Sequence, residues 1–121
     1  MIVVDTSIWV DHFRQPQEAL ATLIAEGGLA LHPYVLGELA LGGFPSKGEI
    51  FDEMMQLARA PIASAAEAMA FIAWAGLAGT GVGYVDIHLL ISARLLGNGK
   101  VLTFDKRLHA QAKLLGVAYQ A

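Results

Sequence analysis

Four carboxylates follow or lie within apolar segments, where a charge is costly unless something compensates it. They are Asp5 in VVDTS, Glu38 in VLGELALG, Asp86 in GYVDIHLL and Asp105 in LTFDKRL. Carboxylate oxygens without thiolate or obligatory imidazole partners are the ligands that Mg²⁺ and Mn²⁺ prefer. Carboxylates packed together would repel one another strongly without a cation. These residue types therefore predict a divalent-metal site, provided that the fold brings them together.

Each acid also has a simpler interpretation. Asp86 and Asp105 stand where helix N-caps favour Asp. Asp5 could be a turn residue at the end of a strand, and Glu38 a helix former. Only their convergence favours the metal site over these local roles.

The surroundings of two acids indicate partial burial. Glu38 lies within one helical turn of Tyr34 and Leu41, so we expect it to share a face with apolar residues and not to point to solvent. Asp86 begins a helix whose apolar face includes Leu89, so we expect it at the edge of the core. An acid in either place needs a partner.

Two hydroxyls are candidates for orienting the carboxylates. Ser7 follows Asp5 by two residues, and Thr103 precedes Asp105 by two, so in an extended chain each points to the same side as its acid. Hydroxyl donors of this kind hold metal-binding carboxylates in place. Ordinary polar residues near strand ends are the alternative interpretation.

Short apolar runs alternate with longer helical patterns along the chain. The apolar runs are residues 2–4, 29–31, 61–63, 101–104 and 117–119, and the helical patterns cover about residues 8–13, 19–24, 33–41, 46–58, with Ser46 as cap, 64–77, 86–96 and 105–115. Unbroken apolar strands separated by helices predict a parallel sheet covered on both faces.

The elements therefore predict one α/β domain over residues 1–121, a three-layer α/β/α architecture with about five parallel strands and right-handed crossovers. In such sheets, sites form at the carboxyl ends of the strands, where the strand order reverses. With the order 3-2-1-4-5, the first and fourth strands are neighbours. Asp5 and Asp105 would then meet at that point.

The charge of the chain does not exclude a nucleic-acid substrate. The net charge is −3, but setting the four acids aside leaves seven acidic against eight basic residues. Arg14, Lys106 and Arg107 closely follow the acidic segments and could contact phosphates. Solvated surface charge is the alternative for each of them.

The composition limits the class of protein. Apolar residues make up 55%, above the usual ~45–50%, so we expect apolar surface for a partner. The absence of Cys excludes disulfides and thiolate metal sites and agrees with a cytoplasmic location. No basic segment precedes an apolar one at the start, and the longest apolar run is interrupted by glycines. We therefore expect neither a secretion signal nor a membrane span.

The histidines do not supply another metal site. His88 stands two residues after Asp86, so on a helix the two face different sides. His12, His32 and His109 lie in separate segments. We interpret these three as surface or structural residues.

The chain resembles the VapC toxins of type II toxin–antitoxin systems, which are PIN-domain nucleases. The matching segments are DTSIWVDHFR, HPYVLGELALG, GYVDIHLLISARL and VLTFDKRLHAQAKLLGVAY, and they carry all four acids in the same order and spacing. The resemblance implies a PIN fold and an Mg²⁺- or Mn²⁺-dependent endoribonuclease that leaves a 3′-hydroxyl and a 5′-phosphate. It also implies a VapB antitoxin, whose carboxyl-terminal segment lies across the active-site groove, and a homodimer.

The roles within this site differ. We expect Asp5 and Asp86 to bind the ion directly, and Glu38 and Asp105 to be further ligands or to position the attacking water. Many relatives carry another acid shortly after the position of Asp105, where this chain has Lys106, Arg107 and Leu108. This departure bears on whether a second ion is held.

Two other classes of protein remain as alternatives. One is a PIN-like module that binds RNA or a protein without cutting. The other is a receiver-like phosphorylation module, which also gathers acids at strand ends. That class expects adjacent acids after the first strand, whereas Thr6 and Ser7 follow Asp5 here.

Overall fold

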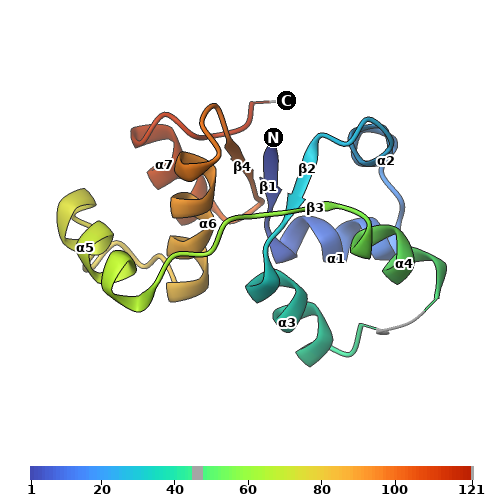
Figure 1. Cartoon of the computed structure of the whole chain (residues 1–121), viewed down its shortest axis with the longest axis horizontal. Coiled ribbons are helices and arrows are strands. Elements are labelled where there is room, and N and C mark those ends of the chain that lie inside the picture. Colours follow the sequence, from blue (N-terminus) through green and yellow to red (C-terminus); the bar gives the residue numbers. More distant parts are fainter. Residues whose placement is uncertain (45–47, 121) are drawn as a thin grey trace.

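The centre of the protein is a parallel sheet of four strands in the order β3-β2-β1-β4 (Figure 1). The computed structural model describes residues 1–44 and 48–120. The strands are β1 (Ile2–Val4), β2 (Leu29–Leu31), β3 (Ala58–Arg59) and β4 (Lys100–Leu102). The predicted parallel α/β architecture is therefore confirmed, and β1 and β4 are neighbours as expected.

Helices connect all the strands. The described residues contain seven: α1 (Thr6–Arg14), α2 (Glu18–Ala25), α3 (Pro33–Leu41), α4 (Glu49–Met55), α5 (Ala65–Ala75), α6 (Tyr84–Leu95) and α7 (Lys106–Leu114). Pairs of helices join successive strands, and α7 follows β4. The segment between α4 and α5, which includes β3, runs across the molecule from α4 on the right of Figure 1 to α5 on the left.

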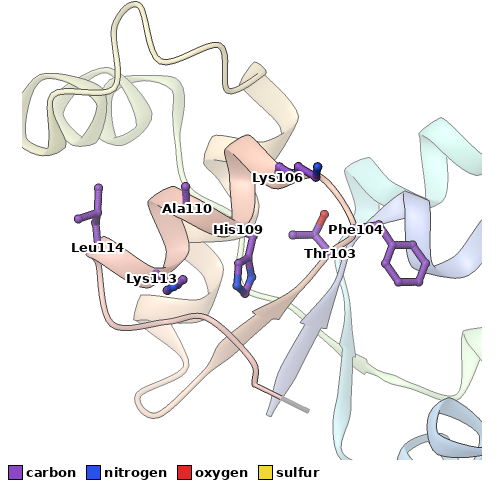
Figure 2. A pocket seen from close by; sticks show the side chains of 7 residues that line it. All are labelled: Thr103, Phe104, Lys106, His109, Ala110, Lys113 and Leu114. Atoms are coloured by element: carbon purple, nitrogen blue, oxygen red, sulfur yellow. The ribbon is translucent and has the colours of Figure 1, made fainter.

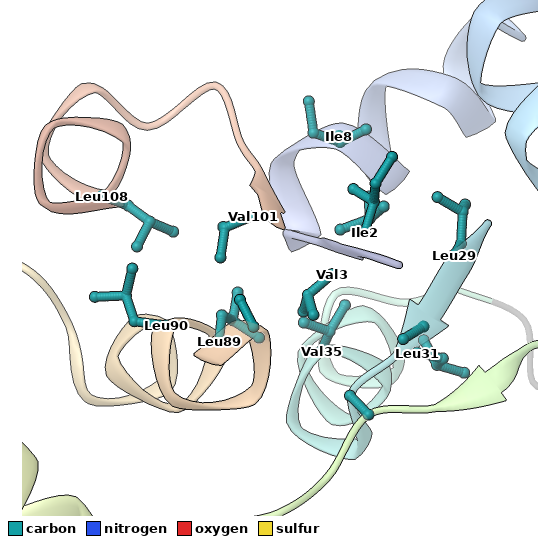
Figure 3. Packing of buried hydrophobic residues seen from close by; sticks show 14 of the residues in the cluster. Ile2, Val3, Ile8, Leu29, Leu31, Val35, Leu89, Leu90, Val101 and Leu108 are labelled. Atoms are coloured by element: carbon teal, nitrogen blue, oxygen red, sulfur yellow. The ribbon is translucent and has the colours of Figure 1, made fainter. Parts of the chain in front are cut away.

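The core explains why the strands are apolar without interruption. All three residues of β1 are buried. Figure 3 shows Val3 directed toward Val35 of α3 and Leu89 of α6, whereas Ile2 is directed to the side of Ile8 in α1. Both faces of the strand are covered by helices, so neither face can be polar.

The prediction of a strand at residues 61–63 was wrong, because β3 lies at Ala58–Arg59. Its pairing with β2 ends where the amide of Ala60 donates to the carbonyl oxygen of Leu31 at 3.0 Å. The next residue, Pro61, has no N–H to donate, so the ladder cannot continue. The buried hydroxyl of Ser92 instead holds the carbonyl oxygen of Pro61 at 2.6 Å.

The predicted fifth strand at residues 117–119 is reduced to one parallel bridge between Val101 and Ala118. The amide of Val101 donates to Val117 at 2.7 Å, and the amide of Tyr119 donates to Val101 at 3.0 Å. The end of the chain thus lies beside β4, in the predicted position, but pairs at a single residue.

Two helix starts differ from expectation. Ser46 lies outside the described residues, and α4 begins after Gly48 and ends at Met55, because Ala58 already pairs with β2. Helix α6 begins at Tyr84, so Asp86 lies within the first turn and is not the N-cap. None of the helices in the described part of the chain is long and apolar enough to span a bilayer.

Candidate functional site

Asp5 ends β1 and caps α1. Its Oδ1 accepts the amide of Thr6 at 2.7 Å, and its Oδ2 accepts the hydroxyls of Ser7 at 3.0 Å and Thr103 at 2.6 Å. The side chain is only 6% exposed. A carboxylate offers about four acceptor positions, so these bonds fix its orientation and leave room for one further partner on Oδ1.

The same hydroxyls connect α1 to the end of β4. The oxygen of Thr103 accepts the amide of Asp105 at 2.9 Å, and that of Ser7 accepts the amide of Phe104 at 3.2 Å. Both hydroxyls therefore donate to Asp5. Thr103 was expected to orient the carboxylate of Asp105, but its hydroxyl donates to Asp5. Ser7 orients Asp5 as expected, but from the first turn of a helix and not from an extended segment. This pairing arises because β1 and β4 are parallel neighbours that end at the same edge.

Asp105 is the N-cap of α7. Its Oδ1 accepts the amides of Arg107 at 2.9 Å and Leu108 at 3.0 Å, and the side chain is exposed. The capping interpretation is therefore confirmed. It does not compete with a chemical role, because these bonds use Oδ1 alone.

Asp86 is half-buried in the first turn of α6, where its Oδ2 accepts the amide of Gly83 at 3.3 Å. The pKa of Asp86 is raised to about 6, first by burial and then by the negative charge of Asp5. The hydrogen bond from Gly83 opposes the rise, while Asp105 and Glu38 add to it. Three acids from other elements thus contribute to the raised pKa of Asp86.

Glu38 is exposed on α3, so the prediction of an apolar surrounding was wrong. Its neighbours Tyr34 and Leu41 are themselves 38% and 91% exposed. Glu38 is instead held by the hydroxyl of Thr6, which donates to Oε1 at 2.6 Å. Sequence reasoning gave Thr6 no role, although a hydroxyl directly after Asp5 was a visible signal.

The acids fit a hydrated metal ion better than a preformed cage. Within residues 1–44 and 48–120, no three His, Asp or Glu side chains are arranged to hold a metal ion. The donors nevertheless suit Mg²⁺, which is commonly bound by one or two carboxylates and keeps several waters. Burial comes first among the causes that raise the pKa of Asp86, and repulsion by Asp5, Asp105 and Glu38 adds to it; a bound cation would offset that repulsion.

The three predicted phosphate contacts lie around the acids. Arg14 lines a hollow of about 290 Å³ that also includes Glu38. Arg107 passes so close to the loop before α6 that a Cβ on Gly81, where φ is +84°, would lie 2.8 Å from its Cδ. Lys106 lines a groove along α7. Whether any of them contacts RNA stays a prediction.

A cluster of rings joins the start of α3 to α6. Tyr34 packs edge-on against His32 and His88, and Tyr84 packs against His88, each at 4.8 Å between ring centres. Burial, followed by the charge of His88, lowers the pKa of His32 to about 4, and burial lowers the pKa of His88. Both rings are buried, so His32 is structural, in line with the prediction of a surface or structural residue.

Comparison with known proteins decides the family. The PIN domain family model matches residues 2–114. The chain belongs to the PIN-domain family. Two relatives from Mycobacterium tuberculosis, strains CDC 1551 / Oshkosh and ATCC 25618 / H37Rv, are named Ribonuclease VapC32. Each is 36% identical over 118 residues, covering 98% of this chain and 95% of the relative. The resemblance to VapC proteins is therefore confirmed, and no solved structure matches the chain.

Proposed function

We propose that this chain is an endoribonuclease toxin of the VapC type, which hydrolyses RNA phosphodiester bonds with Mg²⁺ or Mn²⁺. Its site consists of Asp5, Glu38, Asp86 and Asp105. The observation that carries the proposal is the buried carboxylate of Asp5, which Thr6, Ser7 and Thr103 orient by hydrogen bonds where the neighbouring strands β1 and β4 end. The name of the M. tuberculosis relatives, Ribonuclease VapC32, supports the same activity.

The residues would divide the work as follows. A divalent ion, when bound, offsets the phosphate charge and makes a bound water more acidic. Asp5, oriented by three hydrogen bonds, and the half-buried Asp86 would hold that ion. Glu38 and Asp105 are exposed, and the bonds described use one oxygen of each, so the other oxygen is available to position the attacking water.

The proposal is tested by incubating antitoxin-free protein with structured RNAs and Mg²⁺ and mapping the ends. We expect the wild type to cut RNA and leave 3′-hydroxyls and 5′-phosphates. We expect the Asp5→Asn variant to lose this cleavage. Asp11→Asn is the matched control, because it makes the same change within α1, the helix that Asp5 caps. This variant should cut normally. No cleavage by the wild type, or equal cleavage by Asp5→Asn, would remove the catalytic assignment. RNA binding without cleavage would favour the alternative, a non-catalytic PIN-like module.

An antitoxin of the VapB type is the proposed inhibitor. A groove of about 360 Å³ runs along α3, the helix that carries Glu38, and is lined by Pro33, Leu36, Gly37, Ala40, Phe44 and Phe51. An amphipathic peptide could place apolar side chains in this groove and an Arg or Lys beside the acids. Titration calorimetry with the carboxyl-terminal segment encoded by a neighbouring short reading frame tests this. Leu36→Asp should abolish binding, whereas binding that survives the change would place the peptide elsewhere.

A homodimer is the proposed assembly. Helices α5 and α6 expose Met69, Trp74 and Leu95, which are 53%, 64% and 56% exposed. Such an apolar surface fits a second copy of the chain. Light scattering after gel filtration should give twice the mass of the chain, and a monomer at all concentrations would contradict the assembly.

A further inference from the structure

The largest hollow described lies along α7, outside the acidic site. It has a volume of about 790 Å³ and is lined by Thr103, Phe104, Lys106, His109, Ala110, Lys113 and Leu114 (Figure 2). We call it the α7 groove. One end adjoins Asp5, because Thr103 lines the groove and its hydroxyl donates to that carboxylate at 2.6 Å. A strand of substrate cut at the acids could therefore extend into this groove.

The helical residues of the α7 groove form one face. Lys106, His109, Lys113 and their neighbours Ala110 and Leu114 follow the spacing of three and four residues that places side chains on the same side. The helix packs into the core through Leu108 and Ala112 instead. The lysines of the groove face are therefore outside the buried core.

The charge of the α7 groove suits a polyanion. Of the seven described residues that line it, two are lysines, one is a histidine and none is acidic. Lys106 and Lys113 are exposed and lie seven residues apart, which is about 10 Å along the helix. They can therefore meet different phosphates of one strand.

An exposed aromatic ring also lines the α7 groove. Phe104 is 62% exposed, although a ring of this size is usually buried. Its backbone amide is held by the hydroxyl of Ser7 at 3.2 Å, so the residue is anchored while its ring is free. Exposed rings beside basic side chains are typical of surfaces on which unpaired bases stack.

We infer that the α7 groove binds the single-stranded RNA next to the scissile phosphate. The ring of Phe104 stacks on a base, and the ammonium groups of Lys106 and Lys113 contact phosphates. This inference rests on the proposed ribonuclease function, since it gives the acids a strand to cut. An acidic peptide would contact the lysines but would not need the ring of Phe104. The effect of removing that ring therefore distinguishes RNA from an acidic peptide.

The test measures the binding of labelled RNA by fluorescence anisotropy over a range of KCl concentrations. All proteins carry Asp5→Asn to prevent cleavage, and the probes are a 12-nucleotide single strand and the same strand with abasic sites. Phe104→Ala should weaken binding of the normal strand roughly 5- to 150-fold, the range for one stacked base. It should leave the abasic strand unaffected, because there is no base to stack.

Lys113→Gln should weaken binding of both strands and reduce the slope of log K against log salt by about 0.7, the value for one phosphate contact on a single strand. Arg59→Gln is the matched control, because it removes one charge from β3 at the opposite edge of the sheet. Phe104 and Lys113 are exposed, so both variants should fold, and thermal melting checks this.

The results separate this inference from the proposed function. If the wild type cuts RNA but Phe104→Ala and Lys113→Gln bind like the control, the α7 groove is not the binding surface, while the ribonuclease assignment stands. If the variants lose binding as described but the wild type never cuts, the groove stands and the catalytic assignment fails. Equal loss of normal and abasic strands in Phe104→Ala would also overturn the stacking contact.

Discussion

Replacing Asp86 by Asn should stabilise the protein in the absence of divalent ions. The folded structure raises the pKa of Asp86 from 3.8 to about 6, mainly by burial and by the charge of Asp5. Each unit corresponds to about 1.4 kcal/mol, so the full shift would be about 3 kcal/mol. Because Asp86 is only half-buried and solvent screens part of the repulsion, we expect about 1–2 kcal/mol at neutral pH. Asn keeps an oxygen to accept the amide of Gly83.

The sign of the pH dependence follows from the direction of the shift. Between pH 3.8 and about 6 the folded protein binds more protons at Asp86 than the unfolded chain does. This contribution to the free energy of unfolding is therefore lost as the pH rises through that window. The advantage of Asp86→Asn should be absent below about pH 4 and reach its full size above about pH 7.

The assay is urea unfolding of the wild type and Asp86→Asn from pH 4 to 8, with Asp11→Asn as control. Adding Mg²⁺ should reverse the order, because an ion at about 100 times its dissociation constant stabilises the folded state by about 2.7 kcal/mol. The variant should gain less from the ion. Equal stability of the two proteins at every pH, or a less stable variant at pH 8 without Mg²⁺, would refute the convergence of the acids.

Three further predictions concern single side chains. Thr103→Val should lower Mn²⁺ affinity about 10- to 100-fold in calorimetry, because it removes a donor to Asp5, and unchanged affinity would contradict this role. Asp105→Asn should keep the thermal midpoint, since Asn also caps helices, while RNA cleavage falls; a variant that cuts normally would make Asp105 a cap alone. The third concerns acid stability, because the pKa of His32 is lowered to about 4 by burial and by His88. Since the folded state binds fewer protons at His32 than the unfolded chain, the free energy of unfolding falls as the pH drops from about 6.5 to 4. His32→Asn should make this decrease smaller, as measured by urea unfolding at each pH.

The sequence predicted more of the edge strands than the structure contains. Residues 61–63 and 117–119 have the composition of short strands, but a strand also needs a partner with free amides and carbonyls. Pro61 cannot donate, and the chain end reaches β4 only around Val101. Local composition does not contain this information, because it depends on where the neighbouring strand ends.

The four acids could be selected from the sequence because their signals are local. Asp5 and Asp105 each end an apolar run and begin a helix, and Asp86 and Glu38 lie near the starts or middles of helices with recognisable ends. The parallel α/β pattern then predicted that strand ends meet at one edge. Amino-acid type and spacing were enough for both steps.

Only the tertiary structure decided how these side chains are held and charged. Thr103 donates to Asp5 across 98 positions of sequence, and Thr6 donates to Glu38 across 32. The pKa of Asp86 likewise depends on acids that are distant in the chain. Hydrogen bonds and repulsion between carboxylates depend on separations of a few ångströms. The pairing of β1 with β4 and the packing of the helices set those separations, and no short segment of sequence does.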